Sequence, residues 1–391
     1  MANIKREAKM VLKDAYYFLL RNVAYGLPAL LPMKRDHVLF VELDRTAPSD
    51  SMMLVKQELE QRGFTCDFAS LSKYRGGLGA HALACLRMAS KAGRSRAIVL
   101  CEAITAVGVL RPRKGAQVVQ LWHGCGAFKK FGMSTAEKTF GASRDEKLRF
   151  PDHASTTLVT VSSPEVVWAY EEAMNLEDKG VVRPLGVSRT DVFFDEALVA
   201  KSVEEVHEKY PQIRNRKIML YAPTFRGHVA TAEAPDQLDI ALLRERLGNE
   251  WVLLVKQHPH VRMRPPIPAG CEDFAFDVSD ELTIEACLCA ADACISDYSS
   301  LVFEYSLFRR PMAFFAYDQE DYDDWRGFYY DYDELTPGPV LSTSREVADW
   351  AVGLSAGFDP AEVDAFRERF MSACDGRATE RIVDTMLSLG E

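Results

Sequence analysis

The chain has 391 residues, of which 48% are hydrophobic and 27% charged, and its formal net charge is −10. This length predicts two domains of ordinary size, and the acidic balance argues against general nucleic-acid binding. The nine cysteines contain no Cys-x-x-Cys pair and no zinc-ligand spacing, so we expect reduced core side chains in a cytoplasmic protein.

Residues 1–33 predict an amphipathic helix that lies on an anionic membrane surface. Residues 1–35 hold seven Lys or Arg against two acidic residues, and residues 87–114 hold seven against one. The apolar runs are too short to cross a membrane, and a signal peptide fits poorly. A helix packed on its own domain is the open alternative. The predicted apolar face consists of Ile4, Ala8, Val11, Leu12, Ala15, Leu19 and Val23.

Short apolar runs alternate with helical patterns over residues 34–200, the expected N-terminal domain. The predicted strands are His37–Leu43, Ala97–Cys101, Val118–Trp122 and Leu158–Val161. The predicted helices are Ser51–Arg62 and Pro164–Met174, the second opened by proline. This alternation predicts a parallel sheet covered by helices on both faces.

A polar segment, residues 201–216, is the expected linker to a C-terminal domain at 217–391. The predicted strands there are Ile218–Tyr221, Trp251–Lys256, Ala293–Ser296 and Met312–Phe315. The predicted helices are Leu238–Leu247, Leu282–Ala290, Ser300–Phe308, Ser344–Leu354 and a helical tail over Pro360–Leu389. The fold class we expect is α/β, with two Rossmann-like, doubly wound domains that face a cleft.

Polar clusters follow four of the predicted strands, which is where parallel sheets bind ligands. His123 and Gly124 follow the first of them, and Thr224 and Arg226 follow the second. Lys256 and His258 follow the third. Taken singly, each has a structural explanation: a hydrogen-bonded histidine, a capped loop or a solvated lysine. Together they suit a diphosphate and proton transfer near neutral pH.

The fourth cluster is the segment 297–300, between a buried strand and a helix. Asp297, Ser299 and Ser300 are residue types that cap a helix start, and the free backbone N–H groups there suit a phosphate. An ordinary capped helix is the alternative for this segment alone.

These clusters together resemble the CDP-glycerol glycerophosphotransferase family of teichoic acid synthesis. The motifs are Leu121-Trp122-His123-Gly124, Lys129-Lys130-Phe131-Gly132, Tyr221-Ala222-Pro223-Thr224-Phe225-Arg226, Lys256-Gln257-His258-Pro259, Ser296-Asp297-Tyr298-Ser299-Ser300, Arg310-Pro311 and Tyr317-Asp318. Their order and spacing match over roughly residues 115–335. Chain length and the basic, aromatic N-terminal segment are most similar to the glycerophosphate primase branch.

The resemblance implies a GT-B-like fold in which the N-terminal domain handles the acceptor and the C-terminal domain handles the CDP-alcohol. It implies that His123 takes the proton from the acceptor hydroxyl and that His258 lies beside the donor diphosphate, stabilising charge or protonating the leaving side. The residues expected to bind substrate are Gly124, Lys129, Thr224, Arg226, Lys256, Asp297, Ser299, Ser300 and Glu304. A solvated helix position is the alternative for Glu304.

Cys125 and an acidic run after Tyr317 could suggest further chemistry, but each has a simpler explanation. Cys125 and Gly126 stand where the family often has a different small or polar pair, which leaves the identity of the acceptor open. A nucleophilic Cys125 has little support. The acidic run Asp318, Glu320, Asp321, Asp323 and Asp324 predicts a solvated loop. We expect no required cofactor and no obligatory divalent metal.

The expected function is therefore transfer of glycerol phosphate from CDP-glycerol to a hydroxyl of a membrane lipid-linked saccharide, with release of CMP. The expected acceptor carries undecaprenyl diphosphate, and the enzyme acts peripherally at the cytoplasmic face of the cell membrane. A CDP-ribitol transferase, a poly(glycerol phosphate) polymerase and a sugar-nucleotide glycosyltransferase are alternatives. A non-catalytic binding module of the same fold is the alternative from another class. The oligomeric state stays open, with a homo-oligomer as one possibility.

Overall fold

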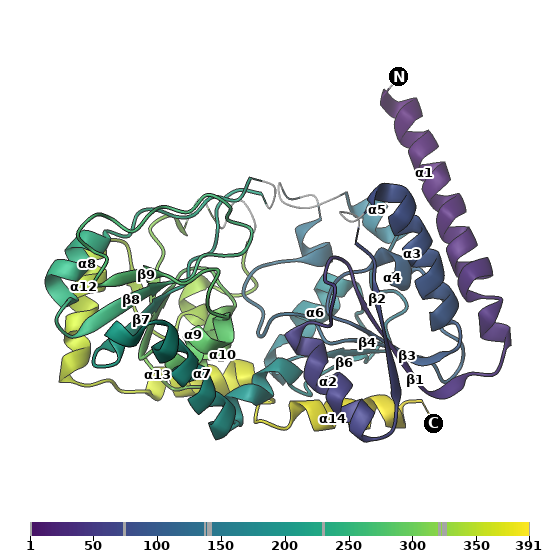
Figure 1. Cartoon of the computed structure of the whole chain (residues 1–391). Coiled ribbons are helices and arrows are strands. Elements are labelled where there is room, and N and C mark those ends of the chain that lie inside the picture. Colours follow the sequence, from purple (N-terminus) through teal and green to yellow (C-terminus); the bar gives the residue numbers. More distant parts are fainter. Residues whose placement is uncertain are drawn as a thin grey trace.

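The computed structural model describes residues 2–72, 76–136, 138, 143–228, 231–319, 322 and 327–390, with side chains from residue 7 onward. Two six-stranded sheets, in which every pair of neighbouring strands is parallel, form the centres of two units that lie side by side (Figure 1). This confirms the predicted α/β fold with two doubly wound sheets.

The first sheet has the order β2-β1-β3-β4-β5-β6. Its strands are β1 (Lys34–Glu42), β2 (Thr65–Ser70), β3 (Ser95–Leu100), β4 (Gln117–Gln120), β5 (Leu158–Thr160) and β6 (Val182–Arg183). The helices of this part of the chain are α1 (Ala2–Leu19), α2 (Asp50–Gln61), α3 (Gly77–Ala92), α4 (Thr105–Gly108), α5 (Arg144–Arg149), α6 (Val167–Met174) and α7 (Glu196–Lys209).

Strand β1 shows how helices cover both faces of this sheet. Val38 and Phe40 pack with α2 and α14, whereas Leu39 and Val41 pack with α3. All four side chains are fully buried. Since side chains alternate between the faces of a strand, a continuous apolar run is what two covered faces require. Each such burial stabilises the fold by about 1.5–3 kcal/mol.

The second sheet has the order β12-β11-β10-β7-β8-β9. Its strands are β7 (Lys217–Tyr221), β8 (Trp251–Val255), β9 (Ala275–Asp277), β10 (Ala293–Ser296), β11 (Met312–Phe315) and β12 (Val340–Leu341). The helices that follow β7 in the chain are α8 (Ile240–Leu247), α9 (Ile284–Ala290), α10 (Leu301–Ser306), α12 (Ser344–Gly353), α13 (Ala361–Met371) and α14 (Ala378–Ser388).

The segment expected as a linker is largely helical. Residues 201–209 belong to α7, which packs against α9, and a short 3-10 helix, Pro211–Ile213, follows. Polar composition suggested a linker because α7 is mostly exposed, but Val206 and Ile213 anchor the segment in the core between the units.

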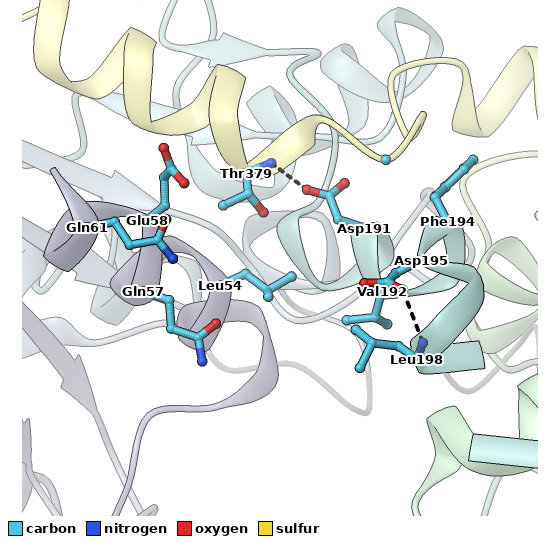
Figure 2. A pocket seen from close by; sticks show the side chains of 11 residues that line it. Leu54, Gln57, Glu58, Gln61, Asp191, Val192, Phe194, Asp195, Leu198 and Thr379 are labelled. Carbon is cyan, nitrogen blue, oxygen red and sulfur yellow. Dashed lines mark hydrogen bonds between the residues drawn. The ribbon is translucent and has the colours of Figure 1, made fainter. Parts of the chain in front are cut away.

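The last helix, α14, returns to the first unit, where it packs against α2 (Figure 1). The backbone N–H groups of Ala378 and Thr379 donate to the Asp191 carboxylate, which caps the start of α14 (Figure 2). A cavity of about 500 Å³ opens beside this joint. Of its three acidic lining residues, Asp191 and Asp195 cap α14 and α7, and Glu58 pairs with Arg62, so all three have structural partners (Figure 2).

The N-terminal helix α1 is attached through only part of its surface. The Tyr16 hydroxyl donates to the carbonyl oxygen of Ala82 (3.2 Å), and the Tyr17 ring lies against Phe150 (5.3 Å between centroids). A π-helical stretch, Leu20–Tyr25, continues the helix and buries both of its end residues. Within the described residues, no helix is long and apolar enough to span a membrane.

Candidate active site

Two loops of the second unit meet where the strand order of its sheet reverses. β7 and β10 are neighbours, and the strands that follow them in sequence, β8 and β11, lie towards opposite edges. This geometry opens a crevice at the carboxyl ends of the strands. The loop after β7 brings Thr224 to the crevice, and the loop after β10 brings Ser299 and Ser300.

The buried carboxylate of Asp297 holds these two loops together. Its Oδ1 accepts hydrogen bonds from the backbone N–H groups of Thr224 (2.8 Å) and Tyr298 (2.6 Å). Its Oδ2 pairs with Arg226 Nη1 (2.9 Å). With only 2% of its surface exposed, Asp297 acts as a fixed internal anchor.

The Arg226 guanidinium is enclosed by protein groups. Its Nε and Nη2 donate to the Asp318 carboxylate at 2.6 and 2.9 Å, a bidentate pair. Its carbon lies 5.1, 5.7 and 5.6 Å from the ring centroids of Tyr298, Tyr317 and Tyr322. Arg226 therefore orders the wall behind the crevice.

Lys256 directly follows β8, and its side chain also contacts protein groups. Its Nζ donates to the carbonyl oxygen of Ser279 (2.8 Å) and to that of Leu282. Burial lowers the pKa of this amine. Lys256 thus secures the segment that leads into α9.

His123 stands on the first unit, in the loop that follows β4. Its Nδ1 lies 2.9 Å from the carbonyl oxygen of Cys101. Because a carbonyl only accepts, Nδ1 carries the proton, and Nε2 of the neutral ring is the nitrogen that accepts one. The Trp122 ring stacks on the imidazole (4.4 Å) and on Phe131 (4.8 Å), which fixes the plane of His123.

His258 has the opposite tautomer. The backbone N–H of His260 donates to His258 Nδ1 (3.2 Å), so Nε2 carries the proton of the neutral ring. Burial lowers the pKa of His258 to about 4, and His260 and Lys129 act in the same direction. Near neutral pH this ring is therefore a neutral hydrogen-bond donor.

A cavity of about 430 Å³ lies between the two units and contains both histidines. Its lining residues are Trp122, His123, Gly124, Cys125, Gly126, Ala127, Phe128, Lys129, Phe131, Tyr170, Pro223, Thr224, Phe225, His258, His260, Ser299 and Ser300. Thr224 is 6% exposed, and its hydroxyl has no hydrogen-bond partner in the described part of the chain. A buried hydroxyl in this state requires an external partner to be satisfied.

The glycines of the His123 loop allow it to touch the second unit. A Cβ at Gly124 would lie 3.5 Å from Ser300 Oγ. Gly126 has φ +62°, and a Cβ there would overlap the Phe303 ring. Cys125 stands between these two glycines. A hydrogen bond with Cys374 and burial raise the pKa of its thiol, which disfavours the thiolate that a nucleophile needs.

Glu304, expected near a substrate hydroxyl, is buried in an ion pair. Its Oε1 lies 2.8 Å from Nε of Arg189, which belongs to the Ser188–Phe194 turn of the first unit. Burial raises the pKa of Glu304, and Arg189 opposes that shift. The position is therefore neither solvated nor part of the cavity lining.

The structure brings most of the predicted site residues together. Those that line the cavity are His123, Gly124, Lys129, Thr224, His258, Ser299 and Ser300. Asp297, Arg226, Lys256 and Glu304 are not among the lining residues, and their contacts described above are to the protein itself. Substrate contact stays a prediction for all eleven residues, and for these four the structure shows no place in the cavity lining.

Sequence reasoning did not select Phe225, His260, Tyr170 or Arg189. Phe225 stands inside one of the motifs that revealed the site and His260 directly follows another, so their positions were a usable signal. Tyr170 lies far from those motifs in sequence, and its hydroxyl donates to the carbonyl oxygens of Gly124 (3.2 Å) and Gly126 (3.0 Å). Nothing in the local pattern around Tyr170 or Arg189 indicated such contacts.

The helix that follows Ser299 and Ser300 is shorter than expected. α10 spans only Leu301–Ser306, so its dipole is small, and the Ser299 and Ser300 side chains are the clearer polar feature. Of the acidic run, Glu320, Asp321, Asp323 and Asp324 lie outside the described residues. Among the residues that are described, no group of three His, Cys, Asp or Glu is arranged to hold a metal ion.

Two doubly wound sheets with a cavity between them define the fold as GT-B-like. The solved structure of the wall teichoic acid polymerase TagF has this fold, with a TM-score of 0.75 over 99% of this chain and 97% of that chain, at 21% identity. The family model for CDP-glycerol:poly(glycerophosphate) glycerophosphotransferases matches residues 24–388. The chain belongs to this family of teichoic acid transferases.

Curated relatives include both ribitol and glycerol enzymes. The teichoic acid ribitol-phosphate primase of Bacillus spizizenii is 33% identical over 93% of this chain and 93% of its own length. The poly(ribitol-phosphate) polymerase of the same organism is 35% identical over 94% of this chain, which spans only 58% of that polymerase. The glycerol-phosphate primase of Bacillus subtilis is 28% identical over 75% of this chain and 74% of its own length.

Proposed function

We propose that this enzyme transfers an alditol phosphate from a CDP-activated alcohol to a hydroxyl of a lipid-linked saccharide and releases CMP. The observation that carries this proposal is the pairing of two opposite histidine tautomers in one cavity. His123 Nε2 can accept a proton, and His258 Nε2 can donate a hydrogen bond. This complementarity suits proton acceptance on one side of the cavity and charge stabilisation on the other, so it favours an enzyme over a non-catalytic module.

The chemistry follows from these groups. The acceptor oxygen forms a bond to the phosphorus that carries the alditol, and the bond from that phosphorus to the CMP oxygen breaks. His123 Nε2 takes the acceptor proton. The CMP phosphate leaves without needing a proton, because the second pKa of a phosphate monoester is about 6. His258 and the hydroxyls of Thr224, Ser299 and Ser300 would therefore stabilise charge on the diphosphate oxygens.

The donor we propose is CDP-ribitol, used to add a priming unit. The ribitol-phosphate primase is similar over nearly its whole length, whereas the glycerol-phosphate primase matches less of the chain at lower identity. CDP-glycerol, the donor expected from the sequence, is the second candidate because the family model carries that name. Polymer formation is the other candidate reaction, because the poly(ribitol-phosphate) polymerase relative is 35% identical over 94% of this chain.

CMP release from each donor tests this function. Purified protein is incubated with CDP-ribitol, CDP-glycerol or a UDP-sugar and a lipid-linked saccharide acceptor. We expect CMP with CDP-ribitol at more than tenfold the rate with CDP-glycerol, and no turnover of the UDP-sugar. CMP release from neither CDP-alcohol would refute transfer and favour a binding module. Faster CMP release from CDP-glycerol would overturn only the choice of CDP-ribitol as donor. The length of the product would distinguish one added unit from many.

The acceptor we propose is an undecaprenyl-diphosphate-linked saccharide, reached from the cytoplasmic face of the membrane. The predicted membrane face of α1 is the exposed one: Val11 and Leu12 are 64% and 72% exposed, and Phe18 beside it is 61% exposed. Basic residues near such a surface add about 1 kcal/mol each towards anionic lipid. Peripheral binding would let the sugar reach His123 while its lipid stays in the bilayer.

Replacing two exposed residues of α1 tests this attachment. Leu12→Glu with Phe18→Glu should reduce cosedimentation with anionic liposomes at least tenfold, because each change removes about 1.5–3 kcal/mol of apolar burial and adds negative charge. Removing residues 1–31 would be a poorer test, since Leu20 and Tyr25 lie in the core. The matched control is Met263→Glu, an 88% exposed site on the second unit. Membrane attachment through α1 would be refuted if the control lost as much liposome binding as the α1 variant, or if the α1 variant lost none.

Metal removal provides another prediction. Treatment with EDTA followed by desalting should leave at least half of the turnover, because hydroxyl and imidazole donors are available for the diphosphate charge. Readdition of Mg²⁺ is the control. Loss of turnover that Mg²⁺ restores would contradict a metal-independent reaction.

A further inference from the structure

The side chain of Arg189, in the first unit, contacts both the His123 loop and two helices of the second unit. Its Nη1 lies 3.4 Å from the carbonyl oxygen of His123. Its Nη2 donates to Glu285 on α9 (2.9 Å), and its Nε lies 2.8 Å from Glu304 on α10. Nη2 also donates to Glu304 Oε2 (3.5 Å), whereas the Nε contact is an ion pair without hydrogen-bond geometry.

The surroundings make this ion pair a strong constraint. The Arg189 side chain is 15% exposed and that of Glu304 is 6% exposed. A buried pair of this kind is costly to break, because the partner left behind is an unpaired buried charge. α10 is also the helix that Ser299 and Ser300 precede, so one guanidinium connects the loop of the base with the loop of these serines.

The packing around the pair is equally close. Gly126, two residues beyond the Gly124 of the same loop, leaves room only for the Phe303 ring of α10. Cys125 Sγ lies 4.0 Å from Glu304 Oε1. A shift of α10 would therefore be transmitted to the His123 loop through both contact and charge.

We propose that Arg189 is a positioning residue, which sets the distance between His123 and the Ser299–Ser300 loop by holding Glu285 and Glu304 across the interface between the units. The role rests on the proposed transfer reaction. Arg189 lies outside the cavity lining, so it acts through His123 and α10. Proton transfer to Nε2 depends on this spacing, and a displacement of about 1 Å can cost 10²-fold in rate.

The test compares Arg189→Met, Arg189→Lys and the triple variant Arg189→Met with Glu285→Gln and Glu304→Gln. Arg189→Met should lower kcat about 10²-fold, while the Kd for a CDP-alcohol, measured by calorimetry, changes less than threefold. Arg189→Lys keeps the charge but loses the fork, and should still lose at least tenfold in kcat. The triple variant removes the unpaired carboxylates and should regain thermal stability without regaining kcat.

Recovery of kcat in the triple variant, or a loss in donor affinity equal to the loss in kcat, would overturn the positioning role. The control is Arg309→Met, which breaks another bidentate pair, with Asp364, inside the second unit. It should leave kcat within twofold.

Hydrogen exchange separates this inference from the transfer reaction itself. Arg189→Met should speed amide exchange at least tenfold at Gly126 and Lys130, and Arg309→Met should not. Unchanged exchange would overturn the inference even in an active enzyme. Faster exchange in a protein that turns over neither CDP-alcohol would support the mechanical link and refute the proposed function alone.

Discussion

His123→Ala should lower kcat by about 10³-fold while the Kd for the CDP-alcohol changes less than threefold. General-base catalysis contributes roughly 10²–10⁴-fold, and the stack with Trp122 and the bond to the Cys101 carbonyl orient this ring for that role. Donor affinity should persist because the diphosphate contacts that we propose come from the second unit. Steady-state CMP release and calorimetry measure the two quantities.

Two controls accompany this variant. His207→Ala changes a histidine of α7 that is not among the lining residues of the cavity, and it should leave kcat within twofold. His123→Gln keeps an acceptor oxygen but no basic nitrogen, so it should recover little of the rate. Turnover of His123→Ala equal to that of the unchanged enzyme would remove His123 from the reaction.

The strands could be predicted from the sequence because buried parallel strands are continuous apolar runs. Ala293–Ser296 and Met312–Phe315 are found within the same bounds, as β10 and β11. β2 was missed because Cys66, Asp67 and Ser70 interrupt its apolar pattern at the edge of the sheet. The two-residue strands β6 and β12 are too short to have any period.

The seven cavity residues that were predicted could be found from the sequence because each follows a strand, and a parallel sheet brings the ends of its strands together. What the sequence could not supply is the direction of each charged side chain. Arg226 and Lys256 stand in the expected loops, yet one faces Asp318 and the other faces backbone carbonyls. Arg189 illustrates the same limit, since Glu304, its partner, is 115 residues away. Such pairs depend on how the two units pack, which no local pattern records.

The tautomers likewise come only from the structure, and they change the role of His258. From the sequence, this ring could stabilise charge or protonate the leaving side. Its pKa of about 4, lowered mainly by burial, leaves it neutral at pH 7, where it holds a proton on Nε2 without releasing it. We therefore propose that His258 stabilises charge on the diphosphate by a hydrogen bond.

His258→Phe should lower kcat by about 10²–10³-fold, which is the cost of removing one donor from a developing negative charge. His258→Gln can place an N–H near the original Nε2, and should recover at least tenfold of that loss. An acid that must be protonated would behave differently, since glutamine could not replace it. Equal activity of the two variants would refute the hydrogen-bond role.

The pH dependence of stability gives an independent reading of the same group. The folded pKa of about 4 lies below the ordinary value of 6.5, so between these values the unfolded chain binds more protons than the folded one. The contribution of His258 to stability is therefore complete above pH 6.5 and falls as the pH is lowered towards 4. Chemical unfolding at pH 7.5 and 5 measures the free energy of unfolding. Its decrease from pH 7.5 to pH 5 should be smaller for His258→Gln than for the unchanged protein. An identical decrease would mean that His258 is not held neutral, and the donor role would lose its basis.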